Sequence, residues 1–364
     1  MSTTAPLAAL LIFVGTYTPK DGASRGIYAV RLDQATGALS SPELAAETPN
    51  PTFLAWHPSH RALYALGVGP DATGQTTGGA AAFTYDAATQ KLAPLNARGA
   101  GSSLMAHVAV DATGRLLVTA SYHGGFLATF PIGDDLKLAD RTSLLPATGT
   151  LGPNRARQDK PHPHSVTFSP DNRFAYVCDL GLDRIFAYAV DPARATLTPA
   201  GEFATASGAG PRHSKISSDG RFLYAINELG SSVSVFARDL ANGALRPVQS
   251  LSTLPAGWSG ESICAEIRLH PNGRFVYGSN RGHDSLAVFA RDPEHGTLTL
   301  LQILPCGGKH PRNFNLSPDG RWLVCANRDS DNLVSFAVDA DTGRLTPTGH
   351  TATVPQAVCV LFAP

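Results

Sequence analysis

The chain has 364 residues, of which 43% are hydrophobic and 16% charged, and its 29 basic residues balance its 29 acidic ones. No long basic run is present, so the sequence lacks the electrostatic footprint of a protein that binds nucleic acid or an anionic membrane. The charged fraction lies below the usual ~25%, whereas glycine (35) and proline (27) are abundant. This composition is typical of many short strands joined by tight turns and argues against a helical bundle.

The N-terminal segment and the cysteines bear on where the protein resides. The apolar run at residues 7–14 is too short to span a bilayer, and no Lys or Arg precedes it as in a signal peptide. We therefore predict that it forms a strand. The cysteines form no CxxC pair and leave an odd count, which favours buried free thiols in a reducing compartment, and we predict a cytoplasmic protein. These cysteines are Cys178, Cys264, Cys306, Cys325 and Cys359.

A strand–turn–strand pattern recurs six times along the chain, each time with an arginine at the end of the turn. Glycine or asparagine usually precedes that arginine and supplies the positive φ that a tight hairpin turn requires. Successive turn arginines are 54, 58, 48, 53 and 47 residues apart. They are Arg61, Arg115, Arg173, Arg221, Arg274 and Arg321.

A second pattern, a strand followed by a hairpin turn and an outer strand, occurs seven times, as at residues 333–345. The extra copy is explained if residues 357–362 form an inner strand and residues 10–16 form the second strand of the same unit. Units of about 50 residues are typical of β-propellers. We therefore predict an all-β, seven-bladed β-propeller of four-stranded blades. Its last blade is closed by one C-terminal and three N-terminal strands, and residues 1–364 form a single domain.

One segment, at residues 144–160, interrupts the repeat and accounts for the longest spacing. As a connection between blades it is expected at one rim of the central channel. Its basic residues Arg155, Arg157 and Lys160 are compatible with an ordinary solvated loop or with a functional role. His57 and His270 lie beside turn prolines and are predicted to be structural residues of the opposite rim.

Positions counted from the turn arginine predict where a site forms. Residues nine before and seven after the arginine should lie near the same rim, where the innermost strands line the channel and a ligand pocket can form. Structural positions elsewhere in the repeat carry nearly the same residue type in every unit. The residues at these two positions differ from unit to unit, and several of them are ionisable. We predict that His164, Arg212, Glu228 and Arg281 are catalytic. The residues predicted to bind substrate are His213, Glu266, His310, Arg312, His107, Tyr122 and Arg328.

Each of these residues, taken singly, is explained as well by an internal ion pair or hydrogen bond, but their clustering at one mouth favours a site for an anionic ligand. No metal-ligand spacing is present, and the arginines would repel a divalent cation. The sequence also has no nucleophile elbow and no phosphate-cradling loop. We therefore expect neither a metal nor an organic cofactor.

The sequence resembles the seven-bladed propeller lactonase family, which includes propeller-type 6-phosphogluconolactonases and carboxy-cis,cis-muconate lactonizing enzymes. The resemblance covers essentially the whole chain. In the muconate-cyclizing branch of the family a histidine, two arginines and a glutamate are implicated, and His164, Arg212, Arg281 and Glu228 match that pattern here. The motifs that carry the resemblance are Val14-Gly15-Thr16-Tyr17-Thr18, Gly26-Ile27-Tyr28, Thr36-Gly37-Ala38-Leu39, Arg157-Gln158, Pro161-His162-Pro163-His164-Ser165, Gly210-Pro211-Arg212-His213, Asn227-Glu228-Leu229, Ala265-Glu266-Ile267-Arg268 and Ser279-Asn280-Arg281-Gly282.

The resemblance does not carry over a substrate, because members of the family act on quite different lactones. Our primary hypothesis is hydrolysis of a small anionic sugar-acid lactone, with 6-phosphogluconolactone as one candidate, by general acid/base catalysis without a metal. His164 is the expected general base, because its ordinary pKa lies near neutrality, whereas arginines should make Glu228 more acidic. Glu228 stays open as the alternative general base, and two alternative functions also stay open. The same residues suit a muconate-type cycloisomerase, and a propeller can also serve as a non-catalytic binding module.

Overall fold

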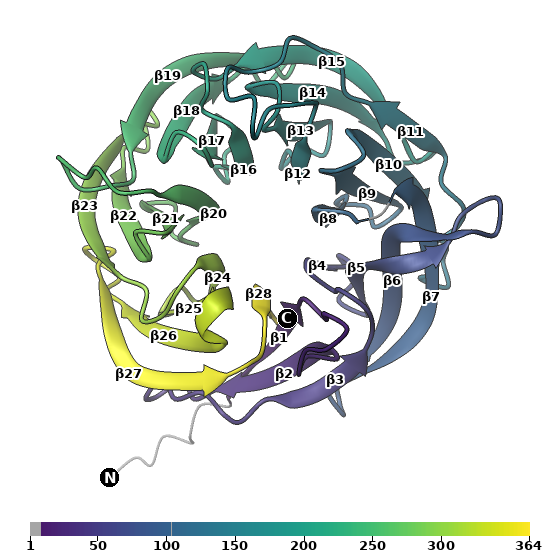
Figure 1. Ribbon diagram of the computed structural model, residues 1–364, viewed down its shortest axis with the longest axis horizontal. Helices are drawn as coiled ribbons and strands as arrows, with labels where there is room; N and C mark the ends of the chain where they lie inside the picture. The colour runs from purple at the N-terminus through teal and green to yellow at the C-terminus, as the bar shows by residue number, and fades with distance from the viewer. Residues whose placement is uncertain (1–8, 103) are drawn as a thin grey trace.

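The computed structural model describes residues 9–102 and 104–364, which form a ring of seven four-stranded antiparallel sheets around a central channel (Figure 1). The predicted all-β, seven-bladed β-propeller is therefore confirmed. The predicted single domain also takes in residues 1–8 and residue 103, which lie outside the described residues.

Each blade runs from an inner strand beside the channel to an outer strand at the perimeter. Six blades are each formed by four consecutive strands. The first of these six consists of β4 (Leu54–Trp56), β5 (Ala62–Pro70), β6 (Thr76–Asp86) and β7 (Lys91–Ser102), and the second of β8 (His107–Val110), β9 (Leu116–Ser121), β10 (Phe126–Pro131) and β11 (Ser143–Pro146). The third consists of β12 (Pro163–Phe168), β13 (Phe174–Asp179), β14 (Arg184–Asp191) and β15 (Thr196–Ala204), and the fourth of β16 (Pro211–Ile216), β17 (Phe222–Asn227), β18 (Ser232–Arg238) and β19 (Leu245–Ser252). The next two consist of β20 (Ile263–Leu269), β21 (Phe275–Arg281), β22 (Ser285–Arg291) and β23 (Leu298–Pro305); and β24 (Pro311–Leu316), β25 (Trp322–Asn327), β26 (Asn332–Val338) and β27 (Leu345–Thr353).

The seventh blade joins the two ends of the chain in the order β28-β1-β2-β3. Its strands are β28 (Ala357–Phe362), β1 (Leu10–Thr16), β2 (Gly26–Leu32) and β3 (Glu43–Glu47). Strand β28 pairs antiparallel with β1, with Ile12 opposite Phe362. The predicted closure is confirmed. Of the N-terminal run predicted as a strand, residues 7 and 8 lie outside the described residues, and β1 begins at Leu10.

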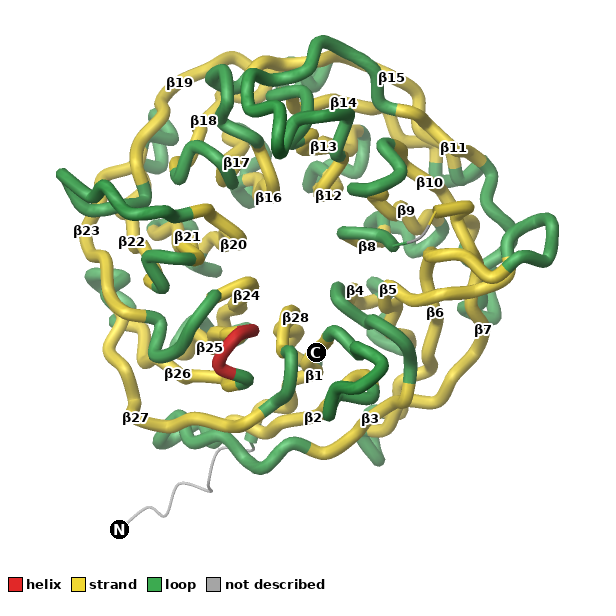
Figure 2. Tube along the Cα trace, viewed as in Figure 1, coloured by secondary structure: helices red, strands yellow, loops and turns green. Residues whose placement is uncertain are grey.

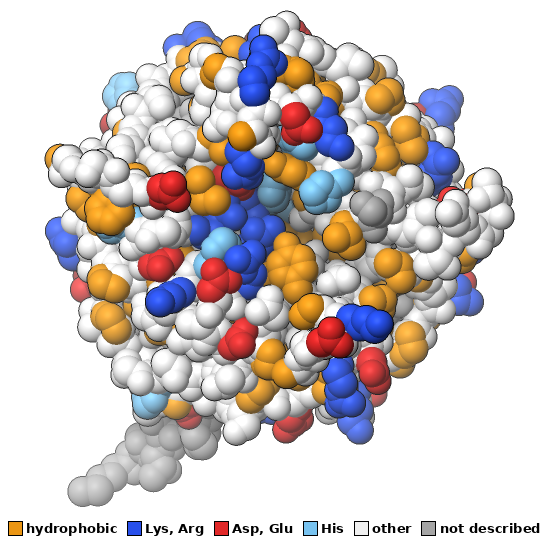
Figure 3. Space-filling view, in the orientation of Figure 1, with side chains coloured by type: hydrophobic (Ala, Val, Ile, Leu, Met, Phe, Trp, Pro, Cys, Tyr) orange, Lys and Arg blue, Asp and Glu red, His pale blue; other side chains and the backbone are white. Residues whose placement is uncertain are grey.

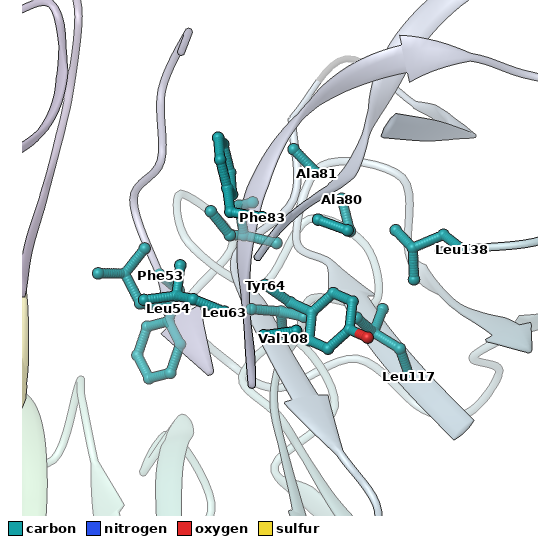
Figure 4. Packing of buried hydrophobic residues seen from close by; sticks show 14 of the residues in the cluster. Phe53, Leu54, Leu63, Tyr64, Ala80, Ala81, Phe83, Val108, Leu117 and Leu138 are labelled. Carbon is teal, nitrogen blue, oxygen red and sulfur yellow. The ribbon is translucent and has the colours of Figure 1, made fainter. Parts of the chain in front are cut away.

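The blades are held to one another by buried apolar side chains and by a repeated tyrosine hydrogen bond. Tyr64 donates its hydroxyl to the carbonyl oxygen of Leu136 in the next blade, and Figure 4 shows its ring beside Leu117 and Val108. Three further tyrosines donate in the same way to a turn glycine of the following blade: Tyr176 to Gly243, Tyr224 to Gly296 and Tyr277 to Gly343. Each bond gives a buried hydroxyl proton an acceptor.

Two histidines beside the turns, His57 and His270, also link neighbouring blades. The Nε2 of His57 lies 3.0 Å from the carbonyl oxygen of Gly114, and that of His270 lies 3.0 Å from that of Gly320. Both partners belong to the turn of a neighbouring blade, so the structural role predicted for these histidines is confirmed. The catalytic candidates therefore do not include them.

One strand boundary differs from the sequence-based expectation. The predicted linker 144–160 begins too early, because residues up to Pro146 pair with β10 as the outer strand β11. In addition, Arg328–Ser330 form a single turn of 3₁₀ helix, the only helical segment among the described residues (Figure 2). No helix in the described part of the chain has the length and apolar character needed to cross a membrane. All five cysteines are buried and unpaired.

Candidate active site

The innermost strands bring the candidate side chains to the channel mouth by means of β-bulges. The pairing register shifts at His164 in β12, at Arg212 in β16 and at Arg312 in β24, in each case one residue after the proline that begins the strand. A bulge leaves one residue unpaired, bends the strand and re-aims a side chain. In β20 the shift lies between Cys264 and Ile267. The positions nine before the turn arginine at His164, Arg212 and Arg312 are therefore bulged positions of inner strands, whereas Glu228 directly follows the second strand β17 and Arg281 ends the second strand β21.

Glu228 is the centre of the site, and three arginines converge on it. Its Oε2 lies 2.9 Å from Arg212 Nε and 2.7 Å from an Nη of Arg281, while Oε1 contacts Arg157. Glu228 is 3% exposed. Burial alone would raise its pKa, but Arg281 and Arg212 together lower it well below the ordinary glutamate value. The carboxylate is therefore ionised at neutral pH and is a weak base.

Hydrogen bonds to backbone carbonyl oxygens fix the positions of two of these arginines. Arg212 donates an Nη–H to the carbonyl oxygen of Ala265 at 2.6 Å, and Arg281 donates one to that of Cys264 at 2.5 Å. Burial lowers the pKa of Arg212, and the positive charge of Arg281 lowers it further. A rigid pair of guanidinium groups is thus present before any ligand arrives.

His164 lies beside this cluster and faces the cavity. It is 5% exposed, and its Nδ1 has no hydrogen-bond partner among the described residues. Burial lowers the pKa of His164 well below its ordinary value, and the charge of Arg212 lowers it further. The imidazole is therefore neutral at neutral pH and can accept a proton. His162, two residues earlier, is instead stacked on Tyr122 outside β12, as a loop residue.

Arg157 is the site residue that the counted repeat did not select, because it lies on the connection between blades and not on a strand. The buried side chain of Gln158 fixes this connection by donating to Leu180 O at 2.9 Å and to an oxygen of Asp183 at 2.8 Å. Arg157 is 37% exposed, far more than the other two arginines on Glu228. The signal available in the sequence was a basic segment that interrupts the repeat at the channel rim.

These side chains border a cavity of about 360 Å³ at the channel mouth. Figure 3 shows the corresponding hollow at the centre of the ring, with basic and histidine side chains gathered around it. One part of its wall is charged, and another part is apolar. Its lining includes the predicted residues His164, Glu228, Arg281, Arg312 and Tyr122, together with Tyr17, Asn50, Thr52, Leu66, Gly67, Leu104, Met105, Ala106, His123, Arg157 and Ile263.

Below this cavity, Arg212 and His213 border a smaller one of about 30 Å³, which is large enough for a water molecule. An arginine can only donate, so the Nη1 of Arg212, 3.1 Å from His213 Nε2, requires that nitrogen to accept. His213 then donates from Nδ1 to Glu266, 3.1 Å away. Glu266 is fully buried and also accepts from Asn313. Glu266 and His213 thus support Arg212 from beneath.

The remaining predicted residues lie outside the main cavity. His107 is buried against Phe53, with ring centroids 4.0 Å apart. His310 Nδ1 lies 3.3 Å from a carboxylate oxygen of Asp329, which also pairs with Arg328. The structure therefore brings together the four predicted catalytic residues, with Tyr122 and Arg312, but not His107, His310 or Arg328. In the part of the chain that is described, no three His, Cys, Asp or Glu side chains are grouped so that they could hold a metal ion.

The fold and the site define a seven-bladed β-propeller with a preorganised Arg–Glu–His cluster at one channel mouth. Comparison with known proteins identifies its family. Residues 11–362 match the family described as lactonase, 7-bladed beta-propeller. The chain belongs to this family.

Known proteins resemble this chain in sequence and in structure over nearly its full length. The chain is 37% identical over 350 residues to a 6-phosphogluconolactonase of Bacillus subtilis, covering 96% of this chain and 97% of the relative. A crystal structure of a protein from Lactobacillus plantarum superposes with a TM-score of 0.90 at 35% identity, covering 98% and 100% of the two chains. The periplasmic gluconolactonase PpgL of Pseudomonas aeruginosa gives a TM-score of 0.90 at 32% identity, covering 98% and 99%.

Proposed function

We propose that this protein hydrolyses the ring ester of a sugar-acid lactone, with 6-phosphogluconolactone as the candidate substrate. The observation that carries the proposal is that His164, whose imidazole makes no hydrogen bond through Nδ1 with any described residue, lines the mouth cavity together with the paired Glu228 and Arg281. The names of the relatives, 6-phosphogluconolactonase and gluconolactonase, support the same reaction.

In the proposed reaction, His164 takes a proton from water as the water oxygen attacks the lactone carbonyl carbon. Arg281 borders the cavity and faces the oxyanion that develops on the carbonyl oxygen; removing one such donor typically costs 10²–10³ in rate. The ring C–O bond then breaks, and protonated His164 returns the proton to the leaving alkoxide. Water is consumed, and one hydroxy acid is formed. Glu228 holds the arginines and stabilises the transient imidazolium by its negative charge.

The pH dependence of kcat/KM follows from the lowered pKa of His164. A base must be neutral to accept a proton, so activity is lost only as the pH falls through the pKa of the free enzyme. Burial and Arg212 place that pKa well below 6.5. We expect kcat/KM, measured by titrating the acid released, to stay level as the pH is lowered through 6.5. A half-maximal point near 6.5 would assign the base role to a less buried group.

The proposal as a whole is tested by offering purified protein a set of lactones, including 6-phosphogluconolactone and glucono-δ-lactone, together with a muconate. We expect hydrolysis of at least one sugar-acid lactone. The muconate is included because several arginines around one cavity also suit a dicarboxylate. Turnover of the muconate alone would make the protein a cycloisomerase, and turnover of none of these compounds would make it a binding module.

A further inference from the structure

Most of the positive charge around the mouth cavity is already occupied by protein groups. Arg157, Arg212 and Arg281 all contact Glu228. Arg212 and Arg281 are in addition bonded to backbone carbonyl oxygens. A ligand anion could use them fully only by displacing Glu228, and the displaced carboxylate would then be buried without its partners.

Arg312 is different, because it makes no hydrogen bond or ion pair with any residue that the structure describes. Its contact is with the ring of Tyr17, whose centroid lies 5.6 Å from the guanidinium carbon. It is half-buried at the bulge of β24 and borders both cavities, as Tyr17 and Thr52 also do. Its N–H groups therefore have no protein acceptor, although the group sits in the wall of the cavity.

The charge of Arg312 is only partly compensated in its surroundings: the hydrogen bond from Arg328 is the main cause of the lowered pKa of Asp329, and the charge of Arg312 contributes to it. The same positive charge is one cause of the lowered pKa of His164 and of His310. The carboxylate of Asp329 is taken by Arg328 and His310, and that of Glu228 by three arginines. A partly buried charge without a partner is unfavourable, so this position should attract an anion.

We infer that Arg312, held against the face of Tyr17, binds the anionic substituent of the substrate, a phosphate monoester or a carboxylate, while the lactone carbonyl faces Arg281 and His164. This inference rests on the proposed function and assigns the part of the substrate that the catalytic cluster does not hold. A guanidinium can grip two oxygens of either anion at once. The aromatic contact restricts its rotation, which reduces the entropy lost on binding.

The test compares Arg312→Met with the matched control Lys309→Met. Lys309 is an exposed cation in the loop before β24, so its replacement removes the same charge without touching the cavity. Calorimetric titrations with gluconate 6-phosphate, glucarate and gluconate measure how much a terminal phosphate or carboxylate adds to affinity. In the unaltered protein we expect one of the two ligands that carry a second, terminal anionic group to bind more tightly than gluconate, which has only its C1 carboxylate, and that ligand identifies the anion.

In Arg312→Met we expect this preference to fall roughly 10- to 100-fold, as for loss of a charge-assisted hydrogen bond. Lys309→Met should retain it. Arg312→Lys keeps the positive charge but lacks the planar guanidinium that can bind two oxygens at once. It should recover part of the binding preference, which separates loss of charge from loss of packing. Thermal unfolding of each variant verifies that it is folded.

The kinetic arm measures kcat/KM for 6-phosphogluconolactone and for uncharged glucono-δ-lactone. Arg312→Met should lower the first and leave the second nearly unchanged. Equal effects on both lactones, an unchanged binding preference, or no preference in the unaltered protein would each overturn the inference. If no lactone is hydrolysed, the proposed function fails, but the titrations still decide the role of Arg312.

Discussion

Replacing His164 with alanine is expected to lower kcat/KM for lactone hydrolysis by roughly 10²–10⁴-fold, the usual contribution of a general base. The physical reason is that Glu228 cannot substitute for the missing imidazole. Burial would raise the pKa of that carboxylate, but Arg281 and Arg212 hold it low, so it has little affinity for a proton. The measurement is initial-rate kinetics on the lactone that the unaltered protein hydrolyses fastest.

The control variant is His350→Ala, which removes an exposed histidine from the outer strand β27 and should leave the rate unchanged. Added imidazole distinguishes a chemical role from a structural one. The cavity of about 360 Å³ lies directly against His164, so free imidazole can reach the vacated position and restore part of the rate. An alanine variant that is folded and fully active would refute His164 as the base.

The fold could be predicted from the sequence because each blade must solve the same packing problem. The turn arginines, the preceding glycines and the alternating apolar residues recur since every sheet packs between two neighbours. The closure of the ring followed from a mismatch between two repeat counts, and the pairing of β28 with β1 confirms it. The end of the outer strand β11 was assigned to the linker because its sequence, Ser-Leu-Leu-Pro, runs straight into that linker without a turn signal.

The site could be predicted only in part, because the repeat gives a residue's place along a strand but not its depth in the channel. Of the residues nine before a turn arginine, His164 and Arg312 line the mouth cavity, whereas Arg212 lines the smaller one. The next position points lower, which is why His213 and Glu266 are engaged beneath Arg212. Arg157 lies outside the repeat altogether, so no count from a turn arginine could reach it.

Replacing Glu228 with glutamine is expected to lower both stability and activity. The substitution removes the negative charge shared by Arg212 and Arg281, which are 3% and 4% exposed, and leaves them as buried cations side by side. Breaking a buried ion pair from one side typically costs about 3–5 kcal/mol. We expect a loss of that order in the free energy of unfolding, measured by urea denaturation. The control Glu202→Gln removes an exposed carboxylate from β15 and should change it by less than about 0.5 kcal/mol.

The pH dependence of this loss provides a check on its cause. Since the arginines hold the pKa of Glu228 below its unfolded value of about 4.3, its stabilising contribution is complete above that pH and declines as the pH falls toward the folded-state pKa. The difference in unfolding free energy between the unaltered protein and Glu228→Gln should therefore be constant near neutrality and shrink below about pH 4.3. A difference that does not depend on pH would mean that the lost stability comes from packing and not from charge.

The same variant should lower kcat/KM roughly 100-fold, because arginines that repel one another shift by about 1 Å from the positions that face the lactone carbonyl.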